Sequence, residues 1–332
     1  MASGSIAEPQ APPSALKPPT GFRHADPLMQ GILAALAAGI LVLIGFFFVR
    51  LVVEARPAFE AYGFFNFVFS DEWVPSKGEF GALPLVFGTL VTSAIALLIG
   101  VPVAIATAVY LTELCPARLR SPLTVLVELL AAVPSVVYGL WGIYFLAPKL
   151  LPAEKWFADT FSFLPFVDGP VSIPNYFVAG LILAIMVLPI VSAITREVMS
   201  TVPKEHKEAA LALGATRWEM IRMAILPYAR PGIAGASMLG LGRALGETIA
   251  VTIVIGNAAV IGDSIFSQGY SLAAVIANEF GEAASDPTHR AALIAAGLLL
   301  FVVTLVINGV ARTYVNRAET AALRSVPKGM AG

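Results

Sequence analysis

Two charged side chains, Arg243 and Glu247, lie four residues apart in the otherwise apolar stretch GLGRALGETIAVTIVIGN. In a helix, positions i and i+4 share one face, so the guanidinium and the carboxylate can form an ion pair. A guanidinium also presents a planar fork of N–H donors that matches the oxygens of an oxyanion. Placing a charged side chain inside a bilayer costs free energy, so an ionisable residue within a membrane span indicates a functional role. We therefore predict that Arg243 faces an anion path and that Glu247 holds it; the alternative is a buried pair that locks helix packing.

Three more polar residues lie in the apolar segment ELLAAVPSVVYGLWG. Ser135 and Tyr138 have hydroxyls that can donate to a passing anion, and Pro134 predicts a broken or kinked helix beside them. Such breaks expose backbone N–H groups inside a membrane protein. Glu128 is expected near the inner end of its helix, where its carboxylate reaches interfacial water; a role on the anion path is the further hypothesis for it.

The elements that must position these residues are membrane helices. The chain has 332 residues, of which 58% are hydrophobic and 13% charged, whereas a soluble domain is about 25% charged. A spanning helix needs about 20 apolar residues. The sequence therefore predicts an all-α membrane protein with six transmembrane helices, at about 28–53, 83–112, 122–148, 176–197, 229–258 and 290–312. One cysteine and three separated histidines predict no metal site.

The loops between these spans indicate their orientation. With the N-terminus in the cytoplasm, most of the lysines and arginines fall in inner segments, as the positive-inside rule requires. We therefore predict that both termini are cytoplasmic. The expected divisions are a disordered tail (1–27), a first span with an extracytoplasmic extension (28–82), a transmembrane domain (83–315) and a C-terminal tail (316–332).

Two outer segments, 54–82 and 149–175, are long and carry aromatic residues among prolines. Aromatic side chains are common where a protein meets the membrane–water interface. We interpret them as interfacial anchors, and a docking surface for an extracytoplasmic partner is the alternative.

The inner segment 195–232 is too long for a bare connection. Pro203 suits a helix N-terminus, KEHKEAALAL predicts a short helix, and Gly214 suits its end. TRWEMIRMAIL predicts a second amphipathic helix, which Pro227 stops. Such a pair of helices either lies on the membrane surface or inserts into a groove on another protein.

The sequence EAALALGATRWEMIRMAILP in this segment resembles the EAA loop of binding-protein-dependent ABC importer permeases. Ala224 stands where that family usually has isoleucine. The resemblance implies a type I ABC importer permease fold and a coupling loop, residues 199–228, that docks into a nucleotide-binding subunit. The chain has no GxxxxGK[ST] phosphate loop, so ATP and Mg²⁺ are expected on that separate subunit and no cofactor is expected here. The matching positions are Glu208, Ala209, Ala210, Gly214, Leu226 and Pro227.

Three further segments, GRALGET, FGALPLVFGTLVTSAIALLIGVPVAI and ELLAAVPSVVYGLWG, resemble the phosphate-specific importer permeases. The resemblance covers about residues 60–315 and favours the C-type subunit. It implies a transport subunit, not an enzyme, in the bacterial inner membrane. The partners that it implies are an A-type permease subunit, two ATPase subunits and an extracytoplasmic phosphate-binding protein, with lipid and not nucleic acid around it.

Two other readings remain open at this stage. One is a permease of the same family for sulfate, molybdate or a phosphonate, which the inner loop does not separate from phosphate. The other is a proton-coupled secondary transporter with Arg243, Glu247 and Glu128 as a relay.

Overall fold

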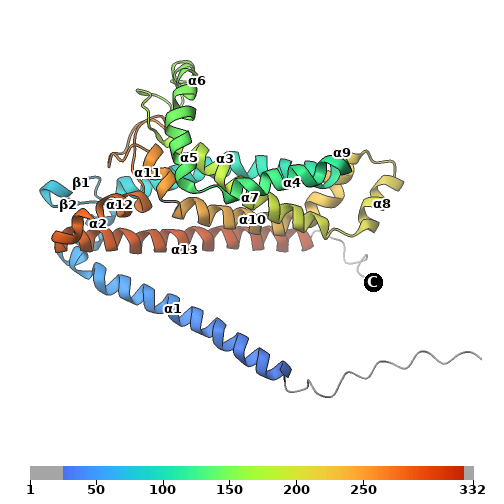
Figure 1. Ribbon diagram of the computed structural model, residues 1–332, viewed down its shortest axis with the longest axis horizontal. Helices are drawn as coiled ribbons and strands as arrows, with labels where there is room; N and C mark the ends of the chain where they lie inside the picture. Colours follow the sequence, from blue (N-terminus) through green and yellow to red (C-terminus); the bar gives the residue numbers. More distant parts are fainter. Residues whose placement is uncertain (1–24, 325–332) are drawn as a thin grey trace, which may run out of the picture. The chain divides into compact units, whose positions relative to one another are not determined.

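The computed structural model describes residues 25–324, and helices make up most of that range (Figure 1). Of the predicted tails, residues 1–27 and 316–332, residues 1–24 and 325–332 lie outside the described residues. The chain divides into two compact units, residues 1–50 and 51–332, which are described separately below. The predicted helical fold class is confirmed, whereas the number of spans and the cytoplasmic position of both termini stay predictions.

The first unit contains most of helix α1 (Ala25–Tyr62). Every side chain of residues 27–50 is exposed, and the helix is long and apolar enough to cross a membrane. An apolar helix without buried positions suits contact with lipid or with another membrane helix.

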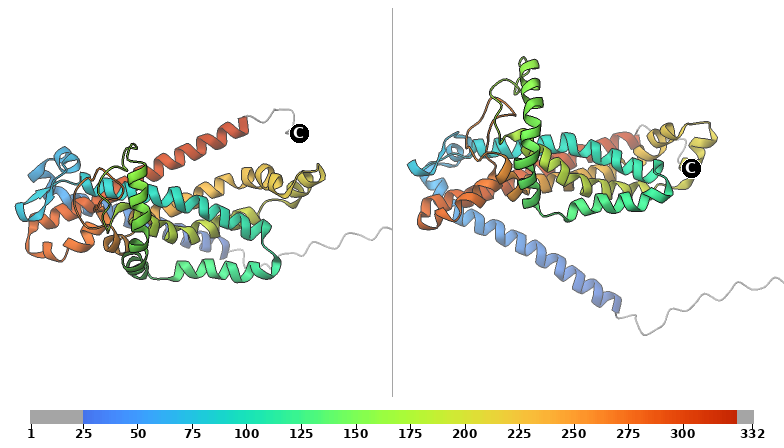
Figure 2. Two further views of the ribbon diagram at one scale, coloured as in Figure 1. Left: turned by 90° about the horizontal axis from the view of Figure 1, so that it is seen from above. Right: turned by 45° about the horizontal axis from the view of Figure 1, so that its top comes forward.

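The second unit is a helical bundle built around α7 (Tyr176–Ser200). Helices α3 (Leu83–Val109) and α10 (Leu226–Gly246) both pack on α7, and α13 (Pro287–Arg324) packs on α10 (Figures 1 and 2). Small residues explain the close approach of α10. A Cβ at Gly240 would lie 2.6 Å from Val187 Cγ1, and Ala236 is fully buried.

Five helices are long and apolar enough to span a membrane, at Pro27–Tyr62, Leu83–Leu114, Ser135–Thr160, Tyr176–Ser200 and Pro287–Thr313. Four of them coincide with predicted spans. The predicted span at 122–148 is interrupted, because Val133 and Pro134 are extended and separate α4 (Ala117–Ala132) from α5 (Ser135–Trp141). A proline disfavours helical geometry at the residue before it. The chain continues from α5 through a π-helical turn, η4 (Gly142–Leu146), into α6 (Ala147–Thr160).

The predicted span at 229–258 is also interrupted. Glu247 adopts an extended conformation (φ −71°, ψ 128°) and ends α10. The short helix α11 (Ile249–Val254) follows. Two of the six predicted spans are therefore discontinuous helices, a form that membrane proteins tolerate where the backbone is covered by protein or lines a cavity.

The two ends of the bundle differ, and we name them inner and outer after the predicted topology. The inner end carries the π-helical turn η3 (Tyr110–Leu114) and the coupling loop, whose elements are α8 (Lys204–Ala212), α9 (Arg217–Met220) and the π-helical turn η5 (Ile221–Ile225). The outer end carries the remaining short elements (Figure 1). These are α2 (Phe64–Phe69), η2 (Pro75–Lys77), α12 (Leu272–Glu279), η6 (Glu282–Ser285) and an antiparallel hairpin of β1 (Trp73–Val74) and β2 (Glu79–Phe80).

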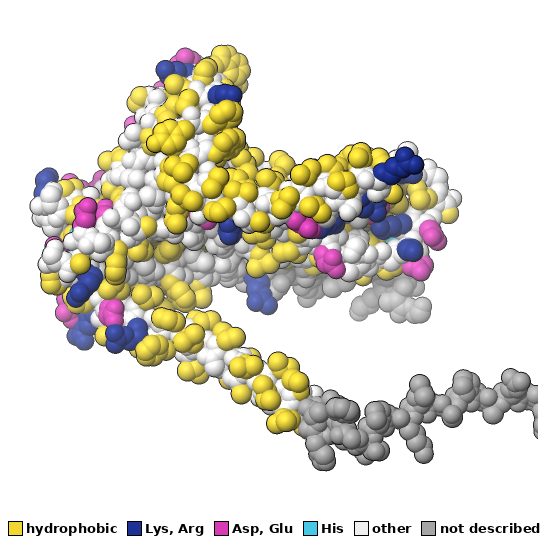
Figure 3. Space-filling view, in the orientation of Figure 1, with side chains coloured by type: hydrophobic (Ala, Val, Ile, Leu, Met, Phe, Trp, Pro, Cys, Tyr) yellow, Lys and Arg dark blue, Asp and Glu magenta, His cyan; other side chains and the backbone are white. Residues whose placement is uncertain are grey.

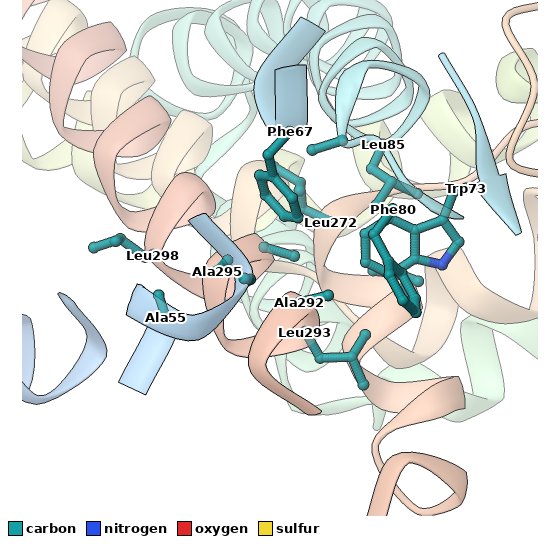
Figure 4. Close-up of a cluster of buried hydrophobic side chains, with 14 of the residues drawn as sticks. Ala55, Phe67, Trp73, Phe80, Leu85, Leu272, Ala292, Leu293, Ala295 and Leu298 are labelled. Carbon is teal, nitrogen blue, oxygen red and sulfur yellow. The ribbon is translucent and has the colours of Figure 1, made fainter. Parts of the chain in front are cut away.

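An aromatic cluster holds the hairpin on the outer end (Figure 4). Phe67, Trp73 and Phe80 are buried against Leu272 and Leu293. Trp73 Nε1 donates to Glu279 Oε2 at 3.0 Å, which fixes the hairpin to α12. Phe67 and Trp73 were interpreted as membrane anchors, but their side chains lie in this core.

Phe65 in the first outer segment is exposed, and the second outer segment also keeps aromatic side chains at the surface. The Trp156 and Phe163 side chains of residues 149–175 are exposed, as both the anchoring and the docking predictions require.

Candidate functional site

The two interrupted helices meet inside the bundle. Helix α5 packs on α11, and the contact is closest at Gly139. A Cβ there would lie 2.8 Å from Ile253 Cδ1 and 3.2 Å from Ala250 Cα. The fold therefore brings together two of the segments that the sequence singled out, although more than a hundred residues separate them.

Tyr138 spans the break between α4 and α5. Its buried hydroxyl donates to the carbonyl oxygen of Leu130 at 2.7 Å. This bond satisfies a carbonyl that the interrupted helix leaves without an intrahelical partner. The hydroxyl predicted to meet an anion is thus already used as a donor, so Tyr138 supports the shape of the break.

Ser135 begins α5 and is half-buried. Its hydroxyl has no hydrogen-bond partner within residues 25–324. The first N–H groups of a helix lack intrahelical acceptors, so the start of α5 presents a hydroxyl and backbone donors at the break.

Arg243 and Glu247 do not form the predicted ion pair. Helix α10 ends at Gly246, between them, so the i, i+4 geometry of a continuous helix is absent. Glu247 Oε1 instead accepts from the backbone N–H of Ala250 at 3.4 Å, at the start of α11. A carboxylate is favourable at a helix N-terminus because it complements the helix dipole.

Arg243 is exposed in this chain. No carboxylate in the described part of the chain lies within ion-pair distance of its guanidinium. Arg243 lies in the last turn of α10, and α11, which follows the break in α10, packs on α5. The end of α10 therefore presents an exposed guanidinium next to its break, an arrangement that can hold an anion transiently.

Glu128 has a partner that the sequence did not predict. Arg196 Nη2 lies 2.6 Å from Glu128 Oε1, and this ion pair joins α4 to α7. The prediction of a carboxylate reaching interfacial water on its own omitted this arginine. The contact gives Glu128 a role in holding the two helices together, and its role on the anion path stays a prediction.

Helix α8 and the turn at Gly214 have the predicted form, but Pro227 does not end the second helix. Helix α9 continues through η5 into α10, and Pro227 lies in the first turn of α10, where a proline is tolerated. Helix α8 ends in a Schellman motif, in which Ala215 N–H donates to Ala210 and Gly214 N–H donates to Leu211. Gly214 has φ +85°, a left-handed conformation that glycine adopts without steric cost.

Helix α9 begins with a capping box between Thr216 and Glu219. Hydrogen bonds from the backbone and the hydroxyl of Thr216 lower the pKa of the Glu219 carboxyl. Both short helices thus have local signals at their boundaries.

The six residues of the EAA-like pattern divide between two environments. Glu208, Ala209, Gly214 and Pro227 are exposed. Ala210 and Leu226 pack against an apolar cluster at the inner end, which includes Met199, Met220 and Ile221.

The tip of the coupling loop is exposed and apolar. Leu213 has an exposed fraction of 90%, and Trp218 has 61%. Lys and Arg side chains gather at the same end of the bundle (Figure 3). A convex tip with apolar and basic side chains suits insertion into a groove on another protein.

The ion-pair partners Arg196, Glu113 and Lys207 were missed as functional candidates. Lys207 Nζ lies 2.7 Å from Glu113 Oε1, across 94 residues of sequence. A single sequence carries no signal for such a pairing beyond a lone charge near the end of an apolar span.

Comparisons with known proteins cover most of the chain. A model of the family described as "Binding-protein-dependent transport system inner membrane component" matches residues 96–320. The phosphate transport system permease protein PstC of Mesorhizobium japonicum is 43% identical over 303 residues, which is 90% of this chain and 92% of the relative. PstC 2 of Mycobacterium tuberculosis is 45% identical over 290 residues, covering 84% of this chain and 89% of the relative.

Solved structures show the same fold. A chain of a bacterial alginate ABC transporter, in complex with an alginate pentasaccharide-bound periplasmic protein, superposes with a TM-score of 0.60 at 21% identity. The match covers 90% of this chain and 98% of that chain. A second structure of a bacterial ABC transporter for alginate import gives a TM-score of 0.57 at 19% identity. At this identity the likeness concerns the fold alone, which is that of a type I ABC importer permease.

Proposed function

Because this chain belongs to the family of binding-protein-dependent transport system inner membrane components, we propose that it is the permease subunit of an ATP-driven phosphate importer in the bacterial inner membrane. It is an integral membrane transport subunit and not an enzyme. The relatives named as phosphate transport system permeases, at 43% and 45% identity, support the substrate. The chain spans about nine tenths of their length.

The observation that carries the proposal is the position of Arg243. An exposed guanidinium without a counter-ion in the described chain lies in the last turn of α10, directly before its break, and α11 beyond the break packs on α5. A charge at the centre of a bilayer costs about 2.5–3.5 kcal/mol on the insertion scale. The presence of Arg243 is explained if this surface lines a hydrated path for an anion, or if it faces a second permease subunit across that path.

The proposed mechanism is alternating access. An extracytoplasmic binding protein delivers phosphate, and this chain and a second, A-type permease subunit form the path between them. A separate pair of ATPase subunits binds ATP and Mg²⁺ and closes on the coupling loop. The loop continues directly into α7 on one side and into α10 on the other, so its movement reaches both helices.

Phosphate uptake tests the proposal. Cells that lack this chain but keep its partner subunits receive the wild-type gene, and uptake of radiolabelled phosphate is measured at low micromolar concentration. We expect the wild-type gene to restore phosphate uptake. Excess sulfate, molybdate or phosphonate should not suppress this uptake. A protonophore should not abolish it as long as ATP remains available.

Two controls separate the alternatives. An ATPase subunit without its phosphate-loop lysine should abolish uptake. Uptake that survives this change and follows the proton gradient would indicate a secondary transporter, and suppression by sulfate or molybdate would assign another oxyanion.

A further inference from the structure

One face of α8 is turned towards the bundle. Among its nine residues, Lys207 and Ala210 are half-buried and the others are exposed. They are three positions apart and therefore share a face of the helix. Ala210 packs on the apolar cluster of the inner end, whereas Lys207 makes an ionic contact.

The partner of Lys207 is Glu113, at the far end of α3. The Lys207 Nζ to Glu113 Oε1 distance is 2.7 Å, and the side chains have exposed fractions of 23% and 12%. Glu113 lies in η3, a π-helical turn that continues α3. A carboxylate near a helix C-terminus is unfavourable for the helix itself, because the dipole is negative there. The position of Glu113 is therefore explained by Lys207 and not by α3.

This contact links α8 to a helix that the chain does not connect to it directly. Helix α8 follows α7 and leads through α9 and η5 into α10. Helix α3 is a distant part of the sequence, yet it packs along α7 and α10. Within residues 25–324, the Lys207–Glu113 contact is the ion pair that joins α8 to another element.

We propose that Lys207 and Glu113 are positioning residues, whose ion pair carries movement of the coupling helix α8 to α3. Helix α3 then moves together with α7 and α10 when the ATPase subunits close. This inference rests on the proposed function, because it needs an ATPase partner that displaces the coupling loop.

The first test exchanges the charges in the purified complex. The wild-type complex, with its ATPase partner and binding protein, is reconstituted in proteoliposomes, and phosphate transported per ATP hydrolysed is measured. We expect K207E to lower this ratio about tenfold, because two like charges then face each other in a half-buried contact. E113K should behave in the same way. The double variant K207E/E113K should return to within about twofold of wild type, since the pair is restored with reversed polarity.

Arg118→Glu is the matched control. Arg118 is exposed at the same end of the bundle, and no ion pair of the described residues includes it. This reversal should leave the ratio close to wild type. A double variant as uncoupled as the single variants would overturn the proposal, as would K207E with a wild-type ratio. Loss of the ATPase partner from purified K207E would also overturn it, because the pair would then shape the docking surface.

A second measurement needs no phosphate. Because Cys115 is the only cysteine, spin labels can be placed at L98C on α3 and L305C on α13 in a Cys115→Ser background. Both leucines are exposed. In the labelled protein that keeps the native Lys207–Glu113 ion pair, ATP binding should change the distance between the labels. K207E should abolish that change.

The two measurements separate the two proposals. A distance change that depends on Lys207 in a complex that transports no phosphate would sustain the role of the ion pair and reject the substrate. Absence of the change in the wild-type pair would reject the role of the ion pair, whatever the uptake.

Discussion

Arg243 lacks an ion-pair partner among the described residues, in contrast to Arg196 and Lys207. Arg196 is paired with Glu128, and Lys207 with Glu113. The guanidinium of Arg243 is exposed in the last turn of α10. A paired charge stabilises a closed structure, whereas an uncompensated one attracts a mobile counter-ion. At the scale of single residues, this contrast supports the proposed role of Arg243 in transport.

We expect Arg243→Gln to lower phosphate uptake by at least about tenfold, because it removes the charge that attracts the anion. Arg243→Lys keeps the charge but loses the planar fork, so its uptake should lie between those of the glutamine variant and wild type. Arg230→Gln, an exposed arginine at the other end of α10, is the control and should transport normally. The measurement is initial-rate uptake, normalised to protein in the membrane. Normal uptake by Arg243→Gln would return Arg243 to a packing role.

Glu154 on α6 is a second residue with an unusual environment. It has an exposed fraction of 3%, and its Oε2 accepts from Asn175 Nδ2 at 3.0 Å, while its Oε1 has no partner. Asn175 in turn caps α7 by accepting from Val178 N–H. A buried carboxylate oxygen without a donor is costly, so the position favours a side chain that is neutral and keeps the acceptor.

We expect Glu154→Gln to keep the thermal stability of the detergent-solubilised protein, because the amide oxygen still accepts from Asn175. Glu154→Ala should destabilise the protein by about 1–3 kcal/mol, because it removes one of the two hydrogen bonds that the buried Asn175 amide nitrogen donates. Glu205→Gln, on the exposed face of α8, is a suitable control. Equal destabilisation by glutamine and alanine would show that the position requires the charge.

At the scale of elements, the sequence predicted the helix boundaries that have a local cause, but it did not predict the one that depends on long-range contacts. Pro203 and Gly214 set the boundaries of α8, because proline restricts its own backbone and glycine adopts a left-handed conformation without steric cost. Pro134 sets the break before α5, because a proline disfavours helical geometry at the residue before it. The break at Glu247 has no comparable local cause, and an apolar run of the right length predicted one continuous helix. Its physical reason is tertiary, since the chain turns to bring α11 against α5 at Gly139.

Gly214 allows a test of an element boundary. A Cβ there meets no atom within 4 Å, but φ is +85°, so the penalty of substitution is backbone strain of about 1–2 kcal/mol. We expect Gly214→Ala to weaken coupling between ATP hydrolysis and phosphate uptake, and Gly214→Val to weaken it more because of its β-branch. Gly235→Ala on α10, where the added Cβ also meets open space and no positive φ occurs, should leave coupling intact. Wild-type uptake per ATP in Gly214→Val would contradict the docking role of the loop.

At the scale of the whole molecule, the second unit has two chemically distinct ends. Its inner end gathers basic side chains and the exposed apolar tip of the coupling loop, whereas its outer end buries an aromatic cluster under a hairpin. The connections after α3 and α7 lie at the inner end, and those before α3, α7 and α13 lie at the outer end. This arrangement fixes the relative direction of the helices, and the positive-inside rule then assigns the sides.

Cysteine labelling tests that assignment. In a Cys115→Ser background, L213C places a thiol at the tip of the coupling loop and F163C places one in the outer segment, where Phe163 has an exposed fraction of 76%. A membrane-impermeant maleimide applied to spheroplasts should label F163C at once and L213C only after the membrane is permeabilised. The ATPase subunit is omitted, because it would cover Leu213 in the proposed complex. Labelling of L213C from outside would show that the predicted topology is inverted. A cytoplasmic ATPase could then not reach the coupling loop, so the same result would also remove the energy source from the proposed mechanism.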